Sequence, residues 1–179
     1  ALLRWGWDGR DDVKHLFLVH QMIARRGGFP ELQKLFTGNF ASTKTQEDYQ
    51  NGNHFLIKPF VNSICLLVKA HSEGDLRKVV DILRNTSPAF DPKGVNAKQT
   101  LGEMKLLALE NINGLSELWS TGSIGDILMY CRTNNLCKIS DRLSEHLDRA
   151  PRAEEYNKEQ HSDDKGDWLS DAFLRMTVT

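Results

Sequence analysis

The chain has 179 residues, and its 23 Lys and Arg residues nearly balance its 24 Asp and Glu residues, giving a formal net charge of -1. This length fits one ordinary domain or one array of small repeats, and a hydrophobic content of 40% excludes a disordered chain. The near-zero charge excludes a histone-like polycation, which binds nucleic acid by neutralising phosphates, and leaves room only for a local basic patch.

The sequence has no apolar run of about 18 residues, so it predicts no membrane span. Its three cysteines are too few and too widely spaced for a disulfide framework, and their odd number favours a reducing compartment. We therefore predict an intracellular protein, cytoplasmic or nuclear. The chain begins without Met and without a signal peptide, which is typical of a processed chain or a piece of a longer one.

The first half of the chain predicts helices separated by glycine-containing breaks. Residues 1–10, rich in Trp and Gly, are expected to form an N-terminal extension. Apolar residues at helical spacing predict helices over residues 13–23, 30–36, 54–71 and 76–83. Residues 37–53 are polar and are expected to form a long loop, with room for a helical turn at its centre.

The second half continues the helical pattern. Apolar spacing predicts helices over residues 95–118, 124–131, 136–147 and 168–176. Gly114 is expected to kink or divide the first of these. Residues 148–167 are densely charged and are expected to form an exposed linker. Sustained alternation of apolar and polar residues is absent from the sequence, which therefore indicates an all-α chain.

Three short apolar patterns follow glycines at a near-constant interval. Gly27, Gly74 and Gly122 are 47 and 48 residues apart, and each is followed by apolar residues at the second, fifth and ninth positions. The apolar residues are Phe29, Leu32 and Phe36; then Leu76, Val79, Val80 and Leu83; then Ile124, Ile127, Leu128 and Cys131. The interval predicts three helix pairs that cover their bare apolar faces by stacking. A single irregular bundle with chance spacing is the alternative.

The first of these patterns resembles an armadillo repeat. Residues 26–35 (Arg-Gly-Gly-Phe-Pro-Glu-Leu-Gln-Lys-Leu) carry the glycine pair, apolar residue, proline and spaced leucines found between its second and third helices. Residues 73–76 and 121–124 keep one glycine and lack the proline. They are more similar to the degenerate armadillo or HEAT-type repeats of large ubiquitin-pathway enzymes and formin-like regulators. The resemblance covers residues 11–147 and implies a scaffold whose concave surface binds peptides or other domains.

We therefore predict an all-α fold, an armadillo/HEAT-like helical repeat stack (an α-solenoid) with an extra C-terminal helix. Residues 1–10 are the N-terminal extension, residues 11–148 are the three-unit repeat domain, and residues 149–179 are a charged linker plus a docking helix. The last helix carries a Trp-Leu-x-x-Ala-Phe-x-x-Met pattern, which fits docking on the repeat end and also fits a helical ligand of a groove.

The sequence contains no pattern typical of catalysis or metal binding. His15 and His20 are five residues apart, which places them on different sides of a helix. Cys137 is the cysteine outside an apolar pattern, but His146 is nine residues away, too far along a helix for a cysteine–histidine pair. Phosphate-binding glycine motifs and the nucleophile elbow do not occur. We predict no enzyme activity, no metal and no cofactor.

The outward faces of the three short helices are the candidate binding surface. The fourth, seventh and eleventh positions after each glycine point away from the apolar face, and in armadillo-like scaffolds this face lines the groove. Arginine and asparagine on such a face can hold an extended peptide. The predicted partner-binding residues, which lie at these positions or close to them, are Lys34, Arg77, Lys78, Asp81, Arg84, Tyr130, Arg132 and Asn134. A polar face that contacts only solvent is the alternative.

The predicted function is a non-catalytic protein–protein interaction scaffold that binds a peptide or a partner domain. Within a larger protein it would be the regulatory or substrate-selecting part. The alternative is an all-α RNA-binding protein, similar to viral nucleoproteins, with a basic stripe and a stacking aromatic residue. The stripe would comprise Arg25, Arg26, Lys34, Lys69, Arg77, Lys78 and Arg84, with Phe29 or Tyr130 for stacking. Acidic residues interleave with these throughout, which favours a protein partner over nucleic acid.

Overall fold

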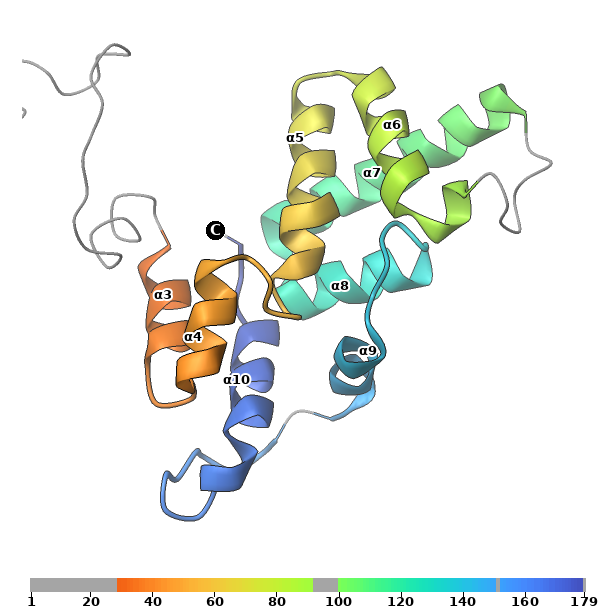
Figure 1. Ribbon diagram of the computed structural model, residues 1–179. Helices are drawn as coiled ribbons and strands as arrows, with labels where there is room; N and C mark the ends of the chain where they lie inside the picture. The colour runs from red at the N-terminus through yellow and green to blue at the C-terminus, as the bar shows by residue number, and fades with distance from the viewer. Residues whose placement is uncertain (1–28, 92–99, 151, 179) are drawn as a thin grey trace, which may run out of the picture. The chain divides into compact units, whose positions relative to one another are not determined.

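The computed structural model describes residues 29–91, 100–150 and 152–178 of the chain (Figure 1). The chain divides into two compact units, Ala1–Lys34 and Leu35–Thr179. In the described part of the first unit, Pro30 opens a helix and Lys34 Nζ lies 2.7 Å from a Glu31 carboxylate oxygen. The helix predicted over residues 13–23 and the break at Gly27-Gly28 lie outside the described residues.

The described residues form eight α-helices and no strand, so the predicted all-α class is confirmed. The α-helices are α3 (Pro30–Thr37), α4 (Thr43–Gln50), α5 (Cys65–Ser72), α6 (Leu76–Thr86), α7 (Leu101–Thr121), α8 (Ile124–Thr133), α9 (Asp141–Asp148) and α10 (Lys165–Leu174). Shorter turns are the π-helical η1 (Phe60–Ile64) and the 3-10 helices η2 (Pro88–Phe90) and η3 (Ser162–Asp164). Each helix in the described ranges is too short or too polar to cross a membrane.

The short helices predicted after Gly74 and Gly122 are confirmed as α6 and α8. Gly74 has φ of 70°, a left-handed conformation that glycine adopts without steric cost, and Asp75 then caps α6 by accepting a hydrogen bond from the Lys78 amide. Ser123 and Asp126 form a reciprocal capping box at the start of α8. The fifth, sixth and ninth residues after each glycine are buried, as the apolar pattern predicts.

Three elements differ from the sequence-based expectations, and side-chain caps set the start of two of them. The loop expected at residues 37–53 contains the two-turn α4, whose first turn is capped by the Ser42 hydroxyl. The helix expected over residues 54–71 starts with turns and η1 before α5 begins at Cys65. The helix expected over residues 136–147 begins only at Asp141, because Ser140 is its N-cap and residues 136–140 run outside any helix.

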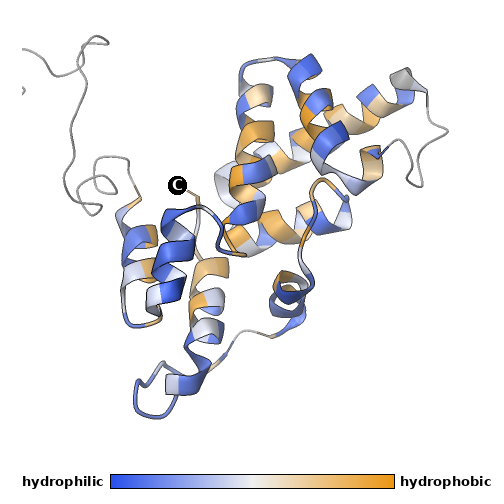
Figure 2. Cartoon of the chain, in the orientation of Figure 1, coloured by the Kyte–Doolittle hydropathy of each residue, from blue (hydrophilic) through white to orange (hydrophobic). Residues whose placement is uncertain are grey.

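The core of the second unit lies where α7 and α10 meet the other helices. α7 contacts α5, α6 and α8, and α10 contacts α8 and α9. Phe36 is fully buried, stacks on Tyr49 at 4.4 Å and meets Phe173 of α10 edge-on at 5.9 Å between ring centroids. The Ile124 amide donates to the Met176 carbonyl at 2.7 Å, which fastens the C-terminal segment to the start of α8. Figure 2 shows α8 as a predominantly hydrophobic helix and α4 as a hydrophilic one.

The charged segment predicted as an exposed linker is mostly exposed, and ion pairs also tie it to α10. Arg149 Nη1 lies 2.6 Å from Asp167, and Arg149 Nη2 lies 2.8 Å from the buried carboxylate of Asp171. Arg152 contacts Asp164 and Asp167 at 3.2 and 3.1 Å. Its guanidinium lies over the indole ring of Trp168, a buried residue of α10. Each guanidinium bridges different carboxylates through different nitrogens, which joins this segment to η3 and α10.

Gly114 does not divide α7, because its missing side chain makes room for Tyr130. A Cβ atom built at Gly114 would lie 2.2 Å from the Tyr130 hydroxyl oxygen and 2.8 Å from the ring carbon that carries it. The hydroxyl donates to the Asn111 carbonyl at 3.2 Å. Tyr130 therefore joins α8 to α7 across a glycine.

The first prediction concerns this contact. Gly114→Ala would gain about 1 kcal/mol from helix propensity in an open helix. Here it should instead destabilise the protein by about 1–2 kcal/mol, because Tyr130 must leave its site. Gly102→Ala, whose Cβ would meet only the Thr100 hydroxyl at 3.9 Å, is the matched control. Thermal unfolding of both variants checks this, and a stabilised Gly114→Ala protein would show that the contact is absent.

The second prediction concerns the arginine–aspartate cluster. Asp171→Ala removes the buried carboxylate and leaves two guanidinium groups short of a partner, so unfolding free energy should fall by about 2 kcal/mol. The loss stays below that of a fully buried pair, because the Arg149 side chain is 33% exposed. Asp163→Ala, an exposed residue of η3, is the control. Equal urea midpoints for the two variants would contradict the structural importance of the cluster.

Candidate functional site

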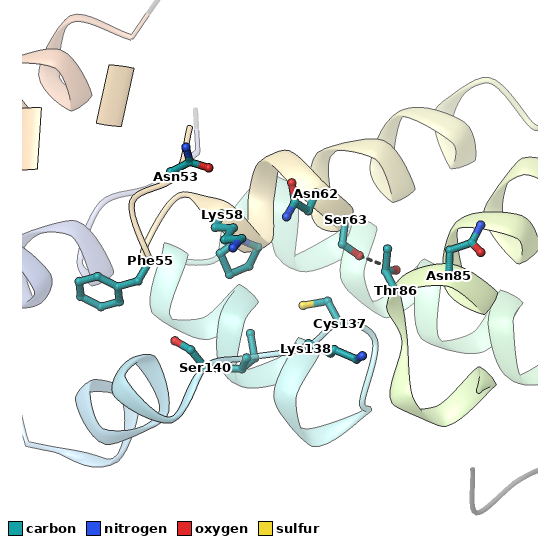
Figure 3. A pocket seen from close by; sticks show the side chains of 12 residues that line it. Asn53, Phe55, Lys58, Asn62, Ser63, Asn85, Thr86, Cys137, Lys138 and Ser140 are labelled. Atoms are coloured by element: carbon teal, nitrogen blue, oxygen red, sulfur yellow. Dashed lines mark hydrogen bonds between the residues drawn. The ribbon is translucent and has the colours of Figure 1, made fainter. Parts of the chain in front are cut away.

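A cleft of about 550 Å³ lies in the second unit where three segments meet (Figure 3). The segments are residues 53–63, the C-terminal end of α6, and residues 137–140. The lining residues are Asn53, Phe55, Lys58, Pro59, Asn62, Ser63, Asn85, Thr86, Cys137, Lys138, Ile139 and Ser140. This volume is within the range of about 300–1,000 Å³ that holds small ligands.

The wall formed by residues 53–63 is anchored by a buried histidine. His54 Nδ1 accepts a hydrogen bond from the Leu56 amide at 3.4 Å, and the imidazole meets the Phe36 ring edge-on at 5.0 Å. At the far end of this wall, the Ser63 and Thr86 hydroxyls are hydrogen-bonded at 3.0 Å. That bond, drawn in Figure 3, joins η1 to the end of α6. Two walls of the cleft are therefore held in a fixed relation.

The third wall, residues 137–140, is shaped by a tight turn after α8. Asn135 has φ of 51°, a left-handed conformation that reverses the chain. Its carbonyl accepts a hydrogen bond from the Ser87 hydroxyl, which secures this wall to the segment that follows α6. Ser140 then caps α9 by accepting from the Leu143 amide at 3.3 Å. The four lining residues stay extended between these two fixed points.

The lining carries positive charge and no carboxylate. Lys58 and Lys138 both line the cleft, both are exposed, and neither forms an ion pair with any other residue that the structure describes. Arg142 adds a third cation at the rim, with its guanidinium carbon 4.1 Å from the centroid of the Phe55 ring. Asp141, the first residue of α9, directly follows the lining residue Ser140 in sequence, but it is not part of the lining. The cleft therefore favours an anionic ligand.

Cys137 lines the cleft but lacks the surroundings of a nucleophile. Its thiol is buried and hydrogen-bonded to that of Cys131, which lowers the pKa of Cys137 against the opposing effect of burial. The same hydrogen bond, with burial, raises the pKa of Cys131. A reactive thiolate needs a neighbouring base and access for a substrate, and the lining contains no histidine. The described residues also contain no group of three side chains suited to a metal ion.

A second cluster resembles a catalytic triad in composition only. The Ser170 hydroxyl lies 3.4 Å from His146 Nε2, and an Asp167 oxygen lies 3.9 Å from the same nitrogen. A triad requires the carboxylate on Nδ1 and the hydroxyl on Nε2, with the hydroxyl open to substrate. Ser170 is completely buried and donates to the Gly166 carbonyl at 2.8 Å. This group stabilises the contact between α9 and α10, and a substrate cannot reach its buried hydroxyl.

The outward side of α6 is an exposed polar strip that ends at the cleft. We call it the α6 surface; its residues are Arg77, Lys78, Asp81, Arg84 and Asn85. Lys78 pairs with Glu73 at 3.4 Å, whereas Arg77, Asp81 and Arg84 form no ion pair within the described ranges. At 1.5 Å per residue the strip is about 12 Å long. Asn85 belongs both to the strip and to the cleft lining, so the two surfaces are continuous.

The predicted binding residues on α8 and α3 are engaged within the chain. Tyr130 contacts α7, and Arg132 Nη2 lies 2.7 Å from an Asp148 oxygen and 3.0 Å from the Met129 sulfur. The Asn134 side chain donates to the Tyr130 carbonyl at 3.0 Å, at the end of α8. Lys34 belongs to the first unit and pairs with Glu31. The predicted residues that share one surface are therefore the four on α6.

Most residues of the cleft escaped the sequence-based reasoning. Lys58 and Asn62 lie in a segment that was predicted to be helical and is helical from Lys58 onward, but no pattern singled them out; Lys138 lies in a segment wrongly predicted to be helical. A signal for that error was available, because Ser140 followed by Asp141 is a typical helix start. No sequence signal brings the three walls together, because they are far apart along the chain.

Comparisons with models of known protein families, with curated proteins and with solved structures gave no match for this chain. The function is therefore inferred from the contacts and charges of the cleft and of the α6 surface.

The third prediction follows from His54. Burial, reinforced by Arg142 and opposed by Asp48, lowers the pKa of His54 from 6.5 to about 4. The folded chain then binds fewer protons than the unfolded chain between these values. Ionisation of His54 therefore leaves the free energy of unfolding unchanged above pH 6.5. It lowers that free energy as the pH falls from 6.5 toward 4, and causes no further change below pH 4. The loss should reach about 2–3 kcal/mol.

Urea unfolding at pH 7.5, 5.5 and 4.5 measures this loss. The His54→Asn variant keeps a side-chain acceptor for the Leu56 amide and should show a shallower pH dependence. Part of the slope should remain, because burial also lowers the pKa of His146. Identical slopes for the variant and the parent chain would contradict the assignment.

Proposed function

We propose that this chain is a non-catalytic helical-repeat domain of the armadillo/HEAT type that binds another protein. The α6 surface and the adjoining cleft form the contact region. In a longer protein the domain would act as its regulatory or substrate-selecting part. The single observation that carries this proposal is the continuity of an exposed charged strip with a cation-lined cleft, through Asn85.

The helix pairs α5–α6 and α7–α8 support the repeat interpretation. Each pair contains a short second helix that begins directly after a glycine and a capping side chain, Asp75 or Ser123. Each short helix buries the same three positions after its glycine. The α5–α6 pair contacts α7 of the following pair, as stacking of neighbours requires.

The charges of the second unit favour a protein partner over RNA. Lys69 and Lys78 both lie near Glu73, at 3.9 and 3.4 Å, so part of the suggested basic stripe is paired with acid. Arg25 and Arg26 lie outside the described residues. Tyr130, suggested as a stacking residue, is occupied in its contact with α7. RNA recognition on single strands depends on open aromatic faces beside unpaired cations.

The fourth prediction tests the α6 surface. Arg77→Glu with Lys78→Glu should weaken capture of the cellular partner about tenfold or more, because two cations of the contact become anions. The fold should tolerate the change, because both positions lie in the first turn of α6, where the helix dipole favours acidic side chains. Capture is measured with the immobilised chain and quantitative mass spectrometry of nuclease-treated lysate.

Lys44→Glu with Lys105→Glu is the matched control, with the same change of charge on exposed positions of α4 and α7. The control should retain the partner at the parental level. Equal retention of the partner by the α6 variant and the control variant would contradict a protein-binding role for the α6 surface. So would the loss of all captured material when nuclease-treated lysate is compared with untreated lysate.

A further inference from the structure

We infer that the cleft is a binding site for an acidic, extended segment of a partner protein. Carboxylates of the segment pair with Lys58 and Lys138, and its main chain pairs with asparagine side chains of the lining. This inference rests on the proposed function, that the chain binds other proteins. It adds the chemistry of the segment that the cleft recognises.

The charge of the lining selects an anion. Twelve residues line the cleft, and they include two lysines and no acid. The two lysines stand on different walls, Lys58 on residues 53–63 and Lys138 on residues 137–140, and Figure 3 shows both at the cleft. Neither is paired with another described residue, so neither has to break an internal ion pair when a ligand binds. Arg142 at the Phe55 end extends the positive potential beyond the lining.

The amides of the lining fit a peptide main chain. Asn53, Asn62 and Asn85 each present an NH₂ donor and a carbonyl acceptor, the complement of the C=O and N–H of an extended chain. All three are exposed. The Asn85 NH₂ group already donates to the Asp81 carbonyl at 2.9 Å, which holds the side chain in place and leaves its oxygen for a ligand amide. Ser140 adds a hydroxyl at the edge.

The same lining is poorly suited to the other anionic ligands. Lysine holds carboxylate and phosphate alike as a point charge, so the three asparagine amides, which phosphate leaves without a main-chain partner, are what favour a peptide. Phe55 is its one aromatic residue, and the Arg142 guanidinium covers that ring. The ring also lies 4.8 Å from the His54 imidazole, so a nucleic-acid base has no free stacking platform. A carboxylate on an extended peptide is the ligand that uses both the lysines and the amides.

The three walls of the cleft are joined by hydrogen bonds, so a peptide can bind without rearrangement of the chain. The Ser63–Thr86 hydrogen bond and the Ser87–Asn135 hydrogen bond connect the end of α6 to both other walls. A preformed site loses little conformational entropy on binding, which matters for a weak, polar ligand.

The fifth prediction uses the whole chain labelled with ¹⁵N and four probes. These are acetyl-Glu-Glu-Glu-Glu-amide, its Gln-Gln-Gln-Gln analogue, inorganic phosphate and a uridine oligonucleotide. We expect saturable chemical-shift changes with the glutamate peptide, both in the backbone amides of residues 137–140 and in the side-chain NH₂ signals of Asn53, Asn62 and Asn85. The neutral analogue should bind at least about tenfold more weakly, since charge-assisted hydrogen bonds are lost. Binding should weaken further when salt is raised.

Lys58→Gln with Lys138→Gln should reduce the affinity for the glutamate peptide about tenfold, with unchanged signals elsewhere. Lys44→Gln with Lys105→Gln has the same change of net charge and should bind like the parent chain. Asn62→Asp changes one exposed side chain nearly isosterically, adds a negative charge to the lining and should abolish binding. Each variant is first checked for an unchanged spectrum outside the cleft.

Several outcomes would overturn the inference. One is equal affinity for the glutamate and glutamine peptides, and another is chemical-shift changes on binding that lie outside the cleft. The others are an equal loss of affinity in the lysine variant and its control, and tighter binding of phosphate or the oligonucleotide at the same residues. If any of these occurs while Arg77→Glu with Lys78→Glu still weakens partner capture, the cleft assignment fails and protein binding through the α6 surface stands. If that charge reversal also leaves capture unchanged, the proposed function fails as well.

Discussion

The burial of α7 between the α5–α6 pair and α8 is the packing on which the second unit depends. α7 contacts all three of these helices, and Ala108, Ile112 and Leu115 are buried one helical turn apart along it. Its other close contact, Tyr130 over Gly114, sets how near α8 can approach. Because α7 positions α8, it also positions the turn that follows α8 and, with it, the third wall of the cleft.

The cleft is a consequence of where the helices stop. α6 ends at Thr86 and α9 begins only at Asp141, after its N-cap Ser140. The last residues of α6 and the non-helical residues 137–140 therefore line the cleft together with residues 53–63. Hydrogen bonds from Ser63 and Ser87 tie these segments together without filling the space between them. The result is a polar, positively charged hollow beside an exposed charged helix face. The charges and side-chain amides of this lining are the features on which the proposed recognition of a protein segment rests.

The sequence predicted those elements in which local signals and burial agree. Gly74 and Asp75 mark the start of α6, and the buried Val79, Val80 and Leu83 follow at helical spacing, so pattern and packing give the same answer. The α4 helix was missed because its eight residues include no buried side chain, and its main signal is the Ser42 cap. Residues 148–167 are largely exposed, as predicted, but their density of charge did not predict that they pair with α10. The arginines of this segment pair with aspartates of α10 only because the fold brings the two segments together, which the sequence pattern does not show.

The candidate site was less accessible to sequence reasoning, for a physical reason. Helical periodicity assigns residues to the inward or outward side of one helix, and it found the α6 surface on that basis. It carries no information on which ends of helices and which loops come together, and the cleft is built from such ends. Periodicity also gave no sign that Tyr130, Arg132 and Asn134, close to the outward positions of α8, make contacts within the chain.

The central claim is that the α6 surface and the cleft form one contact region for a protein partner. Its most direct test is the lysine acetylation footprint of the chain, isolated with its bound partner and compared with the free chain by mass spectrometry. We expect Lys58, Lys78 and Lys138 to be protected in the complex, and Lys44 and Lys105 to react equally in both states. Protection of Lys44 or Lys105 with full reactivity at the other three would contradict the account.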